Sequence, residues 1–213
     1  MIVSDWLSNN YIEVFGAITG VIYVFLEIRQ SIWLWPLGII TSAVYIWVFF
    51  TSKFYADMSL QGYYLVISCL GWYWWKKGTG QEGEKRMGVG EEKQRNGDRE
   101  NKTLQVTRLK LRTGVKLGFV FLLLYAMMWL VLSRLTDSPV PEWDSFITSL
   151  SIVATWMLAR KIYEHWLLWI VVNTVSSVLF LTRGLYPTVI LYIIYGIMSF
   201  SGLAAWKKSI RMV

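Results

Sequence analysis

The chain has 213 residues, of which 55% are hydrophobic and only 16% are charged, and its formal net charge is +7. Its mean hydropathy of +0.42 lies well on the apolar side of soluble domains, because a soluble fold of this length cannot bury so much apolar surface. The composition therefore excludes an ordinary soluble domain and favours a protein that crosses a membrane several times.

Seven windows of mostly apolar residues follow one another, and each is long enough for a helix to cross a hydrocarbon core of about 30 Å. They lie near residues 11–28, 32–50, 56–75, 114–133, 144–160, 164–183 and 185–206. The windows are long and show no period-two alternation, so helices are favoured over a barrel. The first ten residues contain no basic region, and we expect no cleavable signal peptide.

The first three windows carry few polar side chains at membrane depth, where such groups are costly and mark functional interiors. The candidates are Thr41 and Ser42 in the second window and Gln61 in the third. Hydroxyl side chains also pack helices together, so packing explains Thr41 and Ser42 equally well. The amide of Gln61 needs several partners, which favours a ligand. Cys69 is the lone cysteine and excludes a disulfide within the chain.

Residues 78–113 form a Gly-rich, strongly charged segment. Between Lys76 and Lys116 lie 12 of the 21 Lys and Arg and 6 of the 14 Asp and Glu. With almost no apolar residues, the segment is expected to be a disordered cytoplasmic loop. The acidic residues are interspersed and no aromatic side chain is available for stacking, so we expect no nucleic-acid partner.

The fourth window, residues 114–133, separates two segments that resemble each other. A shift of 131 residues aligns the first three windows with the last three without a gap. The matched residues include Arg29 with Arg160, Trp35 with Trp166, Tyr64 with Tyr195, Gly71 with Gly202, and Trp75-Lys76-Lys77 with Trp206-Lys207-Lys208. A single linking helix lets both three-helix units, residues 1–77 and 144–208, enter the membrane from the same side.

The expected fold is therefore an all-α integral membrane protein of seven transmembrane helices, in a 3+1+3 arrangement of parallel repeats like that of SWEET transporters. This plan places a substrate site between the repeats near the middle of the membrane. Transport by rocking of one unit against the other follows as a hypothesis.

The sixth window carries the most specific candidate site. Trp169 and Asn173 are four residues apart and share one helix face, so a ring and an amide could meet on one planar ligand. A permanently cationic aromatic ring would suit such a box through stacking and cation–π attraction. Ser176 and Ser177 lie on the same helix, and helix packing explains them as well as ligand binding does. Further aromatic candidates, many of them expected at the membrane interfaces, are Trp33, Trp35, Tyr45, Trp47, Tyr63, Tyr64, Trp166, Tyr192 and Tyr195.

The basic residues predict the orientation, because short cytoplasmic loops are enriched in Lys and Arg. Alternating the loops between two sides places 18 Lys and Arg on one side and 3 on the other. This puts the C-terminus in the cytoplasm and the N-terminus outside, as an odd number of spans requires.

Catalytic chemistry has little support in the sequence, and we expect no enzyme activity and no cofactor. One histidine, His165, and one cysteine cannot build a metal cluster, and an interfacial or packing role for His165 is favoured over catalysis.

The acidic residues Glu13, Glu27, Asp57, Asp144 and Glu164 lie near window ends, and no chain of buried acids suggests a proton relay. Facilitated diffusion is therefore favoured over pumping. The rival classes are a membrane enzyme and a receptor that binds without transporting.

The segment Trp166-x-x-Trp169-x-x-x-Asn173 resembles the WxxWxxxN motif of the PnuC family of nicotinamide mononucleotide or nicotinamide riboside transporters, and both repeats contain further similar segments. The resemblance implies a seven-helix vitamin facilitator of the bacterial inner membrane, often a homotrimer, whose partners are its substrate and the lipid. It also implies substrate contacts for Trp169, Asn173 and Gln61.

One departure from the family pattern concerns the second window. Nicotinamide riboside transporters commonly carry an Asn there, whereas this chain has WPLGIITSAVY, with Thr41 and Ser42 in place of an amide. Related members carry thiamine or riboflavin. The aromatic box suits the cations nicotinamide riboside and thiamine better than neutral riboflavin, so nicotinamide riboside is the expected substrate and thiamine the close alternative.

Overall fold

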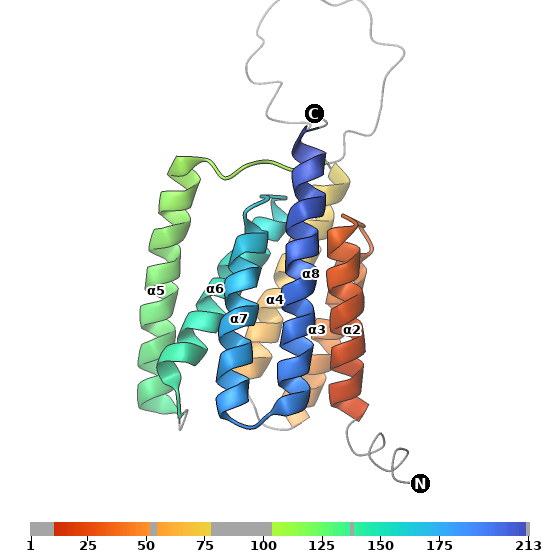
Figure 1. The fold of residues 1–213 in the computed structure, drawn as a ribbon. Helices are drawn as coiled ribbons and strands as arrows, with labels where there is room; N and C mark the ends of the chain where they lie inside the picture. The colour runs from red at the N-terminus through yellow and green to blue at the C-terminus, as the bar shows by residue number, and fades with distance from the viewer. Residues whose placement is uncertain (1–10, 52–54, 78–103, 137–138, 212–213) are drawn as a thin grey trace, which may run out of the picture.

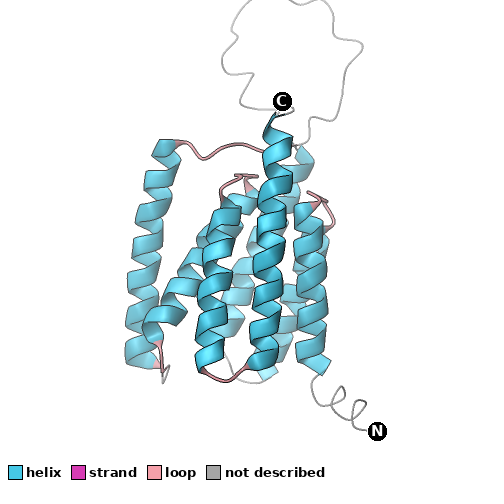
Figure 2. Cartoon of the chain, in the orientation of Figure 1, coloured by secondary structure: helices cyan, strands magenta, loops and turns pink. Residues whose placement is uncertain are grey.

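The computed structural model describes residues 11–51, 55–77, 104–136 and 139–211. Within these ranges the chain forms seven helices and no strand (Figure 2). The helices are α2 (Tyr11–Ile28), α3 (Leu34–Thr51), α4 (Tyr55–Lys77), α5 (Leu111–Leu135), α6 (Pro141–Ala159), α7 (His165–Thr182) and α8 (Tyr186–Arg211). Each helix coincides with one predicted window, so the expectation of an all-helical chain with seven long helices is confirmed.

Four of these helices are by themselves long and apolar enough to cross a membrane. They contain the stretches Leu34–Thr51, Leu111–Arg134, His165–Thr182 and Tyr186–Ile210, found among the residues that the structure describes. Their exposed apolar side chains, such as Phe119 and Ile197, would face water in a soluble protein. In a bilayer the same side chains face lipid tails.

The helices form a bundle in which α2 packs against α3 and α8 (Figure 1). Helix α4 packs against α3 and α6, and α7 packs against α6 and α8. Helix α5 stands at the edge of the bundle and packs against α6. None of its apolar stretch is buried, so six helices surround the interior and α5 stays outside it.

Three of the helix ends share one hydrogen-bonding pattern. After α2, the amide of Ser31 donates to the carbonyl of Leu26 (2.9 Å) across Gln30, whose φ is +52°. After α6, Ile162 donates to Met157 (2.9 Å) across Lys161, whose φ is +50°. This is the Schellman ending, in which a left-handed residue stops the helix. The end of α7 uses the more usual residue, Gly184, with a φ of +71°.

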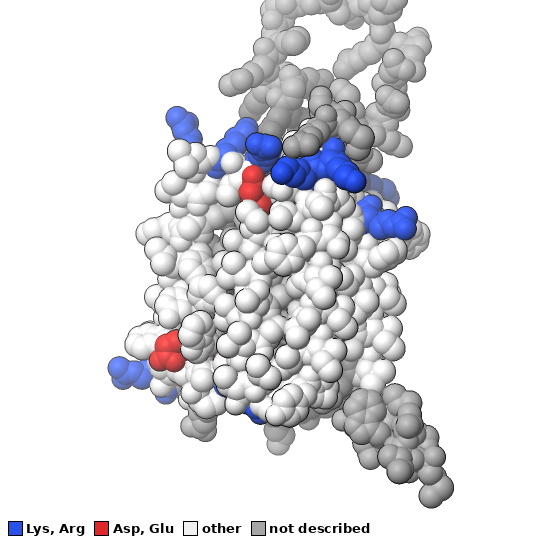
Figure 3. Space-filling model, viewed as in Figure 1, with Lys and Arg blue, Asp and Glu red and all other residues white. Residues whose placement is uncertain are grey.

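Indole rings form much of the core at the end of the bundle that carries the C-terminus. Trp35 of α3 meets Trp75 of α4 edge to face at 5.3 Å, and Trp166 of α7 meets Trp206 of α8 at 5.9 Å. These rings are at most 3% exposed. Figure 3 shows that Lys and Arg gather at this same end of the molecule, so the tryptophan cluster lies beneath a basic surface.

An extended segment, residues 104–110, lies along the link between α6 and α7. The amide of Thr107 donates to the carbonyl of Lys161 (3.0 Å), and the amide of Tyr163 donates to the carbonyl of Thr107 (2.9 Å). The amide of Leu109 donates to the Glu164 carboxylate (2.8 Å). These residues belong to the predicted loop 78–113, of which residues 78–103 lie outside the described part of the chain.

Candidate functional site

A cavity of about 340 Å³ lies in the middle of the bundle. Its wall includes residues from α2, α3, α4, α6, α7 and α8, whereas α5 contributes none. The volume falls in the range of sites for small organic ligands. Glycines and hydroxyl residues make up much of the wall on α2, α3 and α6, so the helix backbones stay close to the space. The cavity is therefore lined by both groups of three helices that the sequence alignment pairs.

Nine of the candidate residues named from the sequence lie in this wall. They are Thr41 and Ser42 on α3, Gln61 and Tyr64 on α4, Trp166, Trp169 and Asn173 on α7, and Tyr192 and Tyr195 on α8. The three residues on α7 point to the same side because they are three, four and seven residues apart, and positions at this spacing share a helix face.

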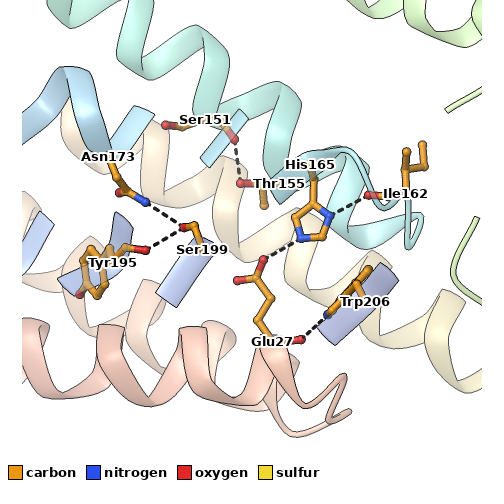
Figure 4. Close-up of polar contacts among 9 residues, drawn as sticks. All are labelled: Glu27, Ser151, Thr155, Ile162, His165, Asn173, Tyr195, Ser199 and Trp206. Carbon is orange, nitrogen blue, oxygen red and sulfur yellow. Dashed lines mark hydrogen bonds and ion pairs between the residues drawn. The ribbon is translucent and has the colours of Figure 1, made fainter. Parts of the chain in front are cut away.

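The Asn173 side chain is held by a short chain of hydrogen bonds. Its Nδ2 donates to Oγ of Ser199 (3.2 Å), which donates to the carbonyl of Tyr195 (2.8 Å) (Figure 4). The Ser177 hydroxyl donates to the backbone carbonyl of Asn173 (2.8 Å) and lies outside the cavity wall. An anchored amide with donor and acceptor capacity remaining is suited to reading one edge of a planar ligand.

Aromatic rings form the apolar part of the wall. Tyr192 and Tyr195 meet edge to face at 5.9 Å, and Phe180 packs against Tyr192 at 5.2 Å. The indole Nε1 of Trp169 is buried and has no hydrogen-bond partner among the described residues. A buried N–H group without a partner is costly. Trp169 lines the cavity with its ring, whereas this N–H group stays buried away from the space.

Several other candidates lie away from the cavity. Trp33 and Trp47 are each 69% exposed on the outer surface, as expected for rings that meet lipid or the interface. Trp35 is fully buried against Gly71, where a methyl group would collide with the indole. Ser176 is fully buried, and its Oγ has no partner in the described part of the chain.

The structure also adds wall residues that sequence reasoning missed. Ser151 and Thr155 on α6 line the cavity, and the Thr155 hydroxyl donates to the Ser151 carbonyl (2.8 Å). Ser68 and Ser199 line it from α4 and α8. The sequence contains one usable signal for these, since Ser68 and Ser199 occupy the same position in the two aligned segments.

Glu27 is the more important addition. It was expected near the end of an apolar window, whereas the structure places it in the cavity wall, 2% exposed. Its Oε1 lies 3.0 Å from Nε2 of His165, and its backbone carbonyl accepts a hydrogen bond from Nε1 of Trp206 (3.0 Å) (Figure 4). Nothing in either local sequence indicates that residues 27 and 165 meet.

Lys161 lies just outside this region, on the link between α6 and α7. Its ammonium group sits 4.2 Å from the centre of the Trp75 ring. Burial lowers the pKa of Lys161 to about 8, because an ammonium group taken out of water loses hydration. The neighbouring Arg160 guanidinium lies over Trp74 at 5.0 Å.

Known proteins resemble nearly the whole of this chain. The nicotinamide riboside transporter PnuC of Escherichia coli is 28% identical over 95% of this chain and 87% of its own length. The riboflavin/roseoflavin transporter RibM of Streptomyces davaonensis is 24% identical over 95% of this chain and 92% of its own length. A crystal structure of the vitamin B3 transporter PnuC matches with a TM-score of 0.69 and 23% identity, covering 99% of this chain and 86% of the other.

The family model called nicotinamide mononucleotide transporter matches residues 10–208. This match includes every helix residue that lines the cavity. The resemblance inferred from the tryptophan and asparagine motif is thereby confirmed. The chain belongs to the nicotinamide mononucleotide transporter family, a family of multi-pass membrane transporters.

Proposed function

We propose that this protein carries nicotinamide riboside across the bacterial inner membrane by facilitated diffusion, with the central cavity as its substrate site. The observation that carries the proposal is the cavity wall itself, where Trp169, Asn173 and Gln61 come together from two helices. The similarity to the Escherichia coli nicotinamide riboside transporter supports the same substrate.

The roles of the wall residues follow from their chemistry. Trp169, with Trp166, Tyr192 and Tyr195 beside it, stacks on the cationic ring, since an aromatic face attracts a cation. The Asn173 and Gln61 amides bind the polar edges of the ligand. Thr41 and Ser42 donate hydroxyl hydrogen bonds where other members have an amide.

We further propose seven membrane-spanning helices in a 3+1+3 arrangement, with the N-terminus outside and the C-terminus in the cytoplasm. The gathering of Lys and Arg at the C-terminal end supports this orientation (Figure 3). The 131-residue repeat is supported by two matched details. Gln30 and Lys161 are both left-handed helix ends, and Gly71 and Gly202 each lie against a matched indole. Assembly as a homotrimer rests on the family resemblance alone.

Calorimetry on the purified protein tests the substrate. Nicotinamide riboside, thiamine and riboflavin are titrated side by side, and the expected result is the tightest binding for nicotinamide riboside. Tight binding of thiamine alone would mean that the altered second span changes the vitamin. The similarity to a riboflavin transporter makes riboflavin the third comparison, and preference for it would overturn the cationic-ring argument.

Counterflow in vesicles separates a carrier from a receptor. Vesicles loaded with unlabelled nicotinamide riboside should take up labelled substrate from outside, since a carrier exchanges the two. A protein that binds the vitamin in calorimetry but exchanges no label would be a receptor, and the transport proposal would fall.

A further inference from the structure

Glu27 is the one side chain with a formal charge among the described residues that line the cavity. Carboxylates are rarely buried unless they are paired, because removing the charge from water is costly. Its partner is His165, which is fully buried at the start of α7 and packs between the rings of Trp166 and Trp206, each at 4.7 Å. The two residues come from different three-helix groups.

The hydrogen bonds of His165 fix where its protons must be. Nδ1 lies 2.7 Å from the carbonyl of Ile162, and a carbonyl can only accept, so Nδ1 carries a hydrogen. In a neutral imidazole Nε2 is then a bare acceptor. It faces Oε1 of Glu27 at 3.0 Å, and two acceptors do not attract. The contact therefore requires one further proton, held either by the imidazole or by the carboxyl group.

Among the residues that the structure describes, no other charged side chain takes part in this contact. Tyr23 on α2 and Tyr64 on α4 line the same cavity, while α6 presents the hydroxyl of Thr155 and α8 the indole of Trp206. On the link, the Lys161 ammonium lies over Trp75 and the Glu164 carboxylate accepts from Leu109. The shared proton is thus held between Glu27 and His165.

We infer that a cation bound in the cavity draws the Glu27 carboxylate away from His165, and that the proton shared by the pair then passes to the solvent. This inference rests on the proposed function, which supplies the cation. The charges balance, because one positive charge enters the cavity as substrate and one leaves as a proton. Trp206 pins the backbone of Glu27, so only the side chain needs to turn. The proton returns when the cation leaves.

Two consequences follow from competition between the proton and the cation. Affinity for a cationic ligand rises with pH, because at higher pH the proton is released more readily. Glu27 also becomes a specificity residue that favours cations over neutral ligands of similar shape, since the buried carboxylate gains a charged partner only from a cation.

The test is calorimetry of nicotinamide riboside binding to the full-length protein at pH 7, in buffers with different enthalpies of ionisation. A proton released on binding is taken up by the buffer, so the observed enthalpy should change linearly with the buffer's ionisation enthalpy, with a slope of up to one proton. Glu27→Gln should abolish the slope and weaken binding about tenfold or more, as expected for a lost charged hydrogen bond. An observed enthalpy independent of the buffer, or full affinity in Glu27→Gln, would overturn the inference.

Two further variants separate the parts of the argument. His165→Gln keeps a donor for Glu27 but stores no proton, so it should bind nicotinamide riboside without a buffer dependence; a retained slope would contradict the inference. Glu164→Gln makes the same chemical change outside the cavity wall and should behave as the wild type. If the wild-type protein is folded, as judged by cooperative unfolding, but binds no vitamin, the result would refute the proposed function instead.

Discussion

The side chain of Asn173 combines two properties that suit a binding residue. It is 5% exposed, and its Nδ2 is anchored to Ser199, so its orientation is set before a ligand arrives. Pre-organised groups lose less entropy on binding than mobile ones do. A ligand that meets this amide therefore gains most of the hydrogen-bond energy.

Asn173→Ala should weaken vitamin binding by about 1–3 kcal/mol, or roughly tenfold to a hundredfold. The fold should survive, because Ser199 keeps its hydrogen bond to the Tyr195 carbonyl. Calorimetry measures the affinity, and thermal unfolding in detergent measures the stability. Thr174→Ala is the matched control, since Thr174 is exposed and donates to its own helix. Equal affinity in both variants would show that Asn173 does not contact the ligand.

The sequence predicted wall residues on four helices, but it predicted that residues lie side by side only where they share one helix. Trp166, Trp169 and Asn173 have the spacing of a helix face, and the sequence shows this directly. Glu27 and His165 are 138 residues apart, and their contact depends on how α2, α7 and α8 pack. No local sequence pattern indicates such a contact. Glu27 was therefore expected near the end of a window, whereas it lies in the cavity wall.

At the scale of helices, indole rings lie against two glycines. The Trp35 ring lies against Gly71 between α3 and α4, and the Trp166 ring lies against Gly202 between α7 and α8. Small residues let membrane helices approach closely. Each ring fills the space that a side chain on the neighbouring helix would need, so both glycines are required for packing.

Gly202→Ala should lower the free energy of unfolding by about 1–3 kcal/mol, the usual cost of overpacking. The added methyl group would collide with Trp166, which is 1% exposed and has no free space to enter. Thermal unfolding in detergent provides the measurement. Gly62→Ala is the control, because a methyl group there meets no atom within 4 Å. The change likewise replaces a helical glycine with alanine, so the two variants differ only in the collision. Similar melting temperatures for both variants would refute this packing argument.

Lys161, on the link between α6 and α7, should make the stability of the protein depend on pH. Its pKa is lowered to about 8 in the folded state but returns to 10.5 when the chain unfolds. Between these values the unfolded chain binds more protons, so stability should rise as the pH rises from about 8 to 10.5. Below pH 8 the buried ammonium group opposes folding.

Lys161→Met should therefore raise the melting temperature at pH 7 and remove the part of the pH dependence that lies above pH 8. The left-handed backbone at this position is equally strained for Lys and Met, so the comparison isolates the charge. The measurement is thermal unfolding across this pH range. A lower melting temperature for the variant would mean that the cation–π contact with Trp75 outweighs the lost hydration.

For the whole molecule, apolar windows predicted the helices well because lipid imposes a length and an apolar character on each span. The ends were harder to place: α5 begins at Leu111 and α8 continues to Arg211, since helices extend past the lipid into polar sequence. The repeat and the 3+1+3 plan stay predictions. For transport, the repeat and the 3+1+3 plan predict that the two three-helix units move against each other around the cavity.

A hydrogen bond between Gln30 and Ser209 joins the two units at the basic end, in addition to the contacts of Glu27 with His165 and Trp206, and it offers a test of this motion. Nε2 of Gln30, after α2, donates to Oγ of Ser209 on α8 (2.9 Å). In a protein whose Cys69 is replaced by Ser, the changes Gln30→Cys and Ser209→Cys allow a short, cleavable thiol cross-linker to join these positions. If the units must separate here, the cross-linked protein should bind vitamin but exchange label in counterflow only at the rate of empty vesicles.

Cleaving the linker should restore exchange, which separates restrained motion from damage to the protein. The matched control is a cross-link within one helix, at Tyr73→Cys and Lys77→Cys, where the native side chains are also 2.9 Å apart. It should leave the rate unchanged, because it restrains no motion between the units. Undiminished exchange in the Gln30–Ser209 cross-linked protein would show that this end of the bundle stays closed during transport, and the moving elements would then have to lie at the opposite end.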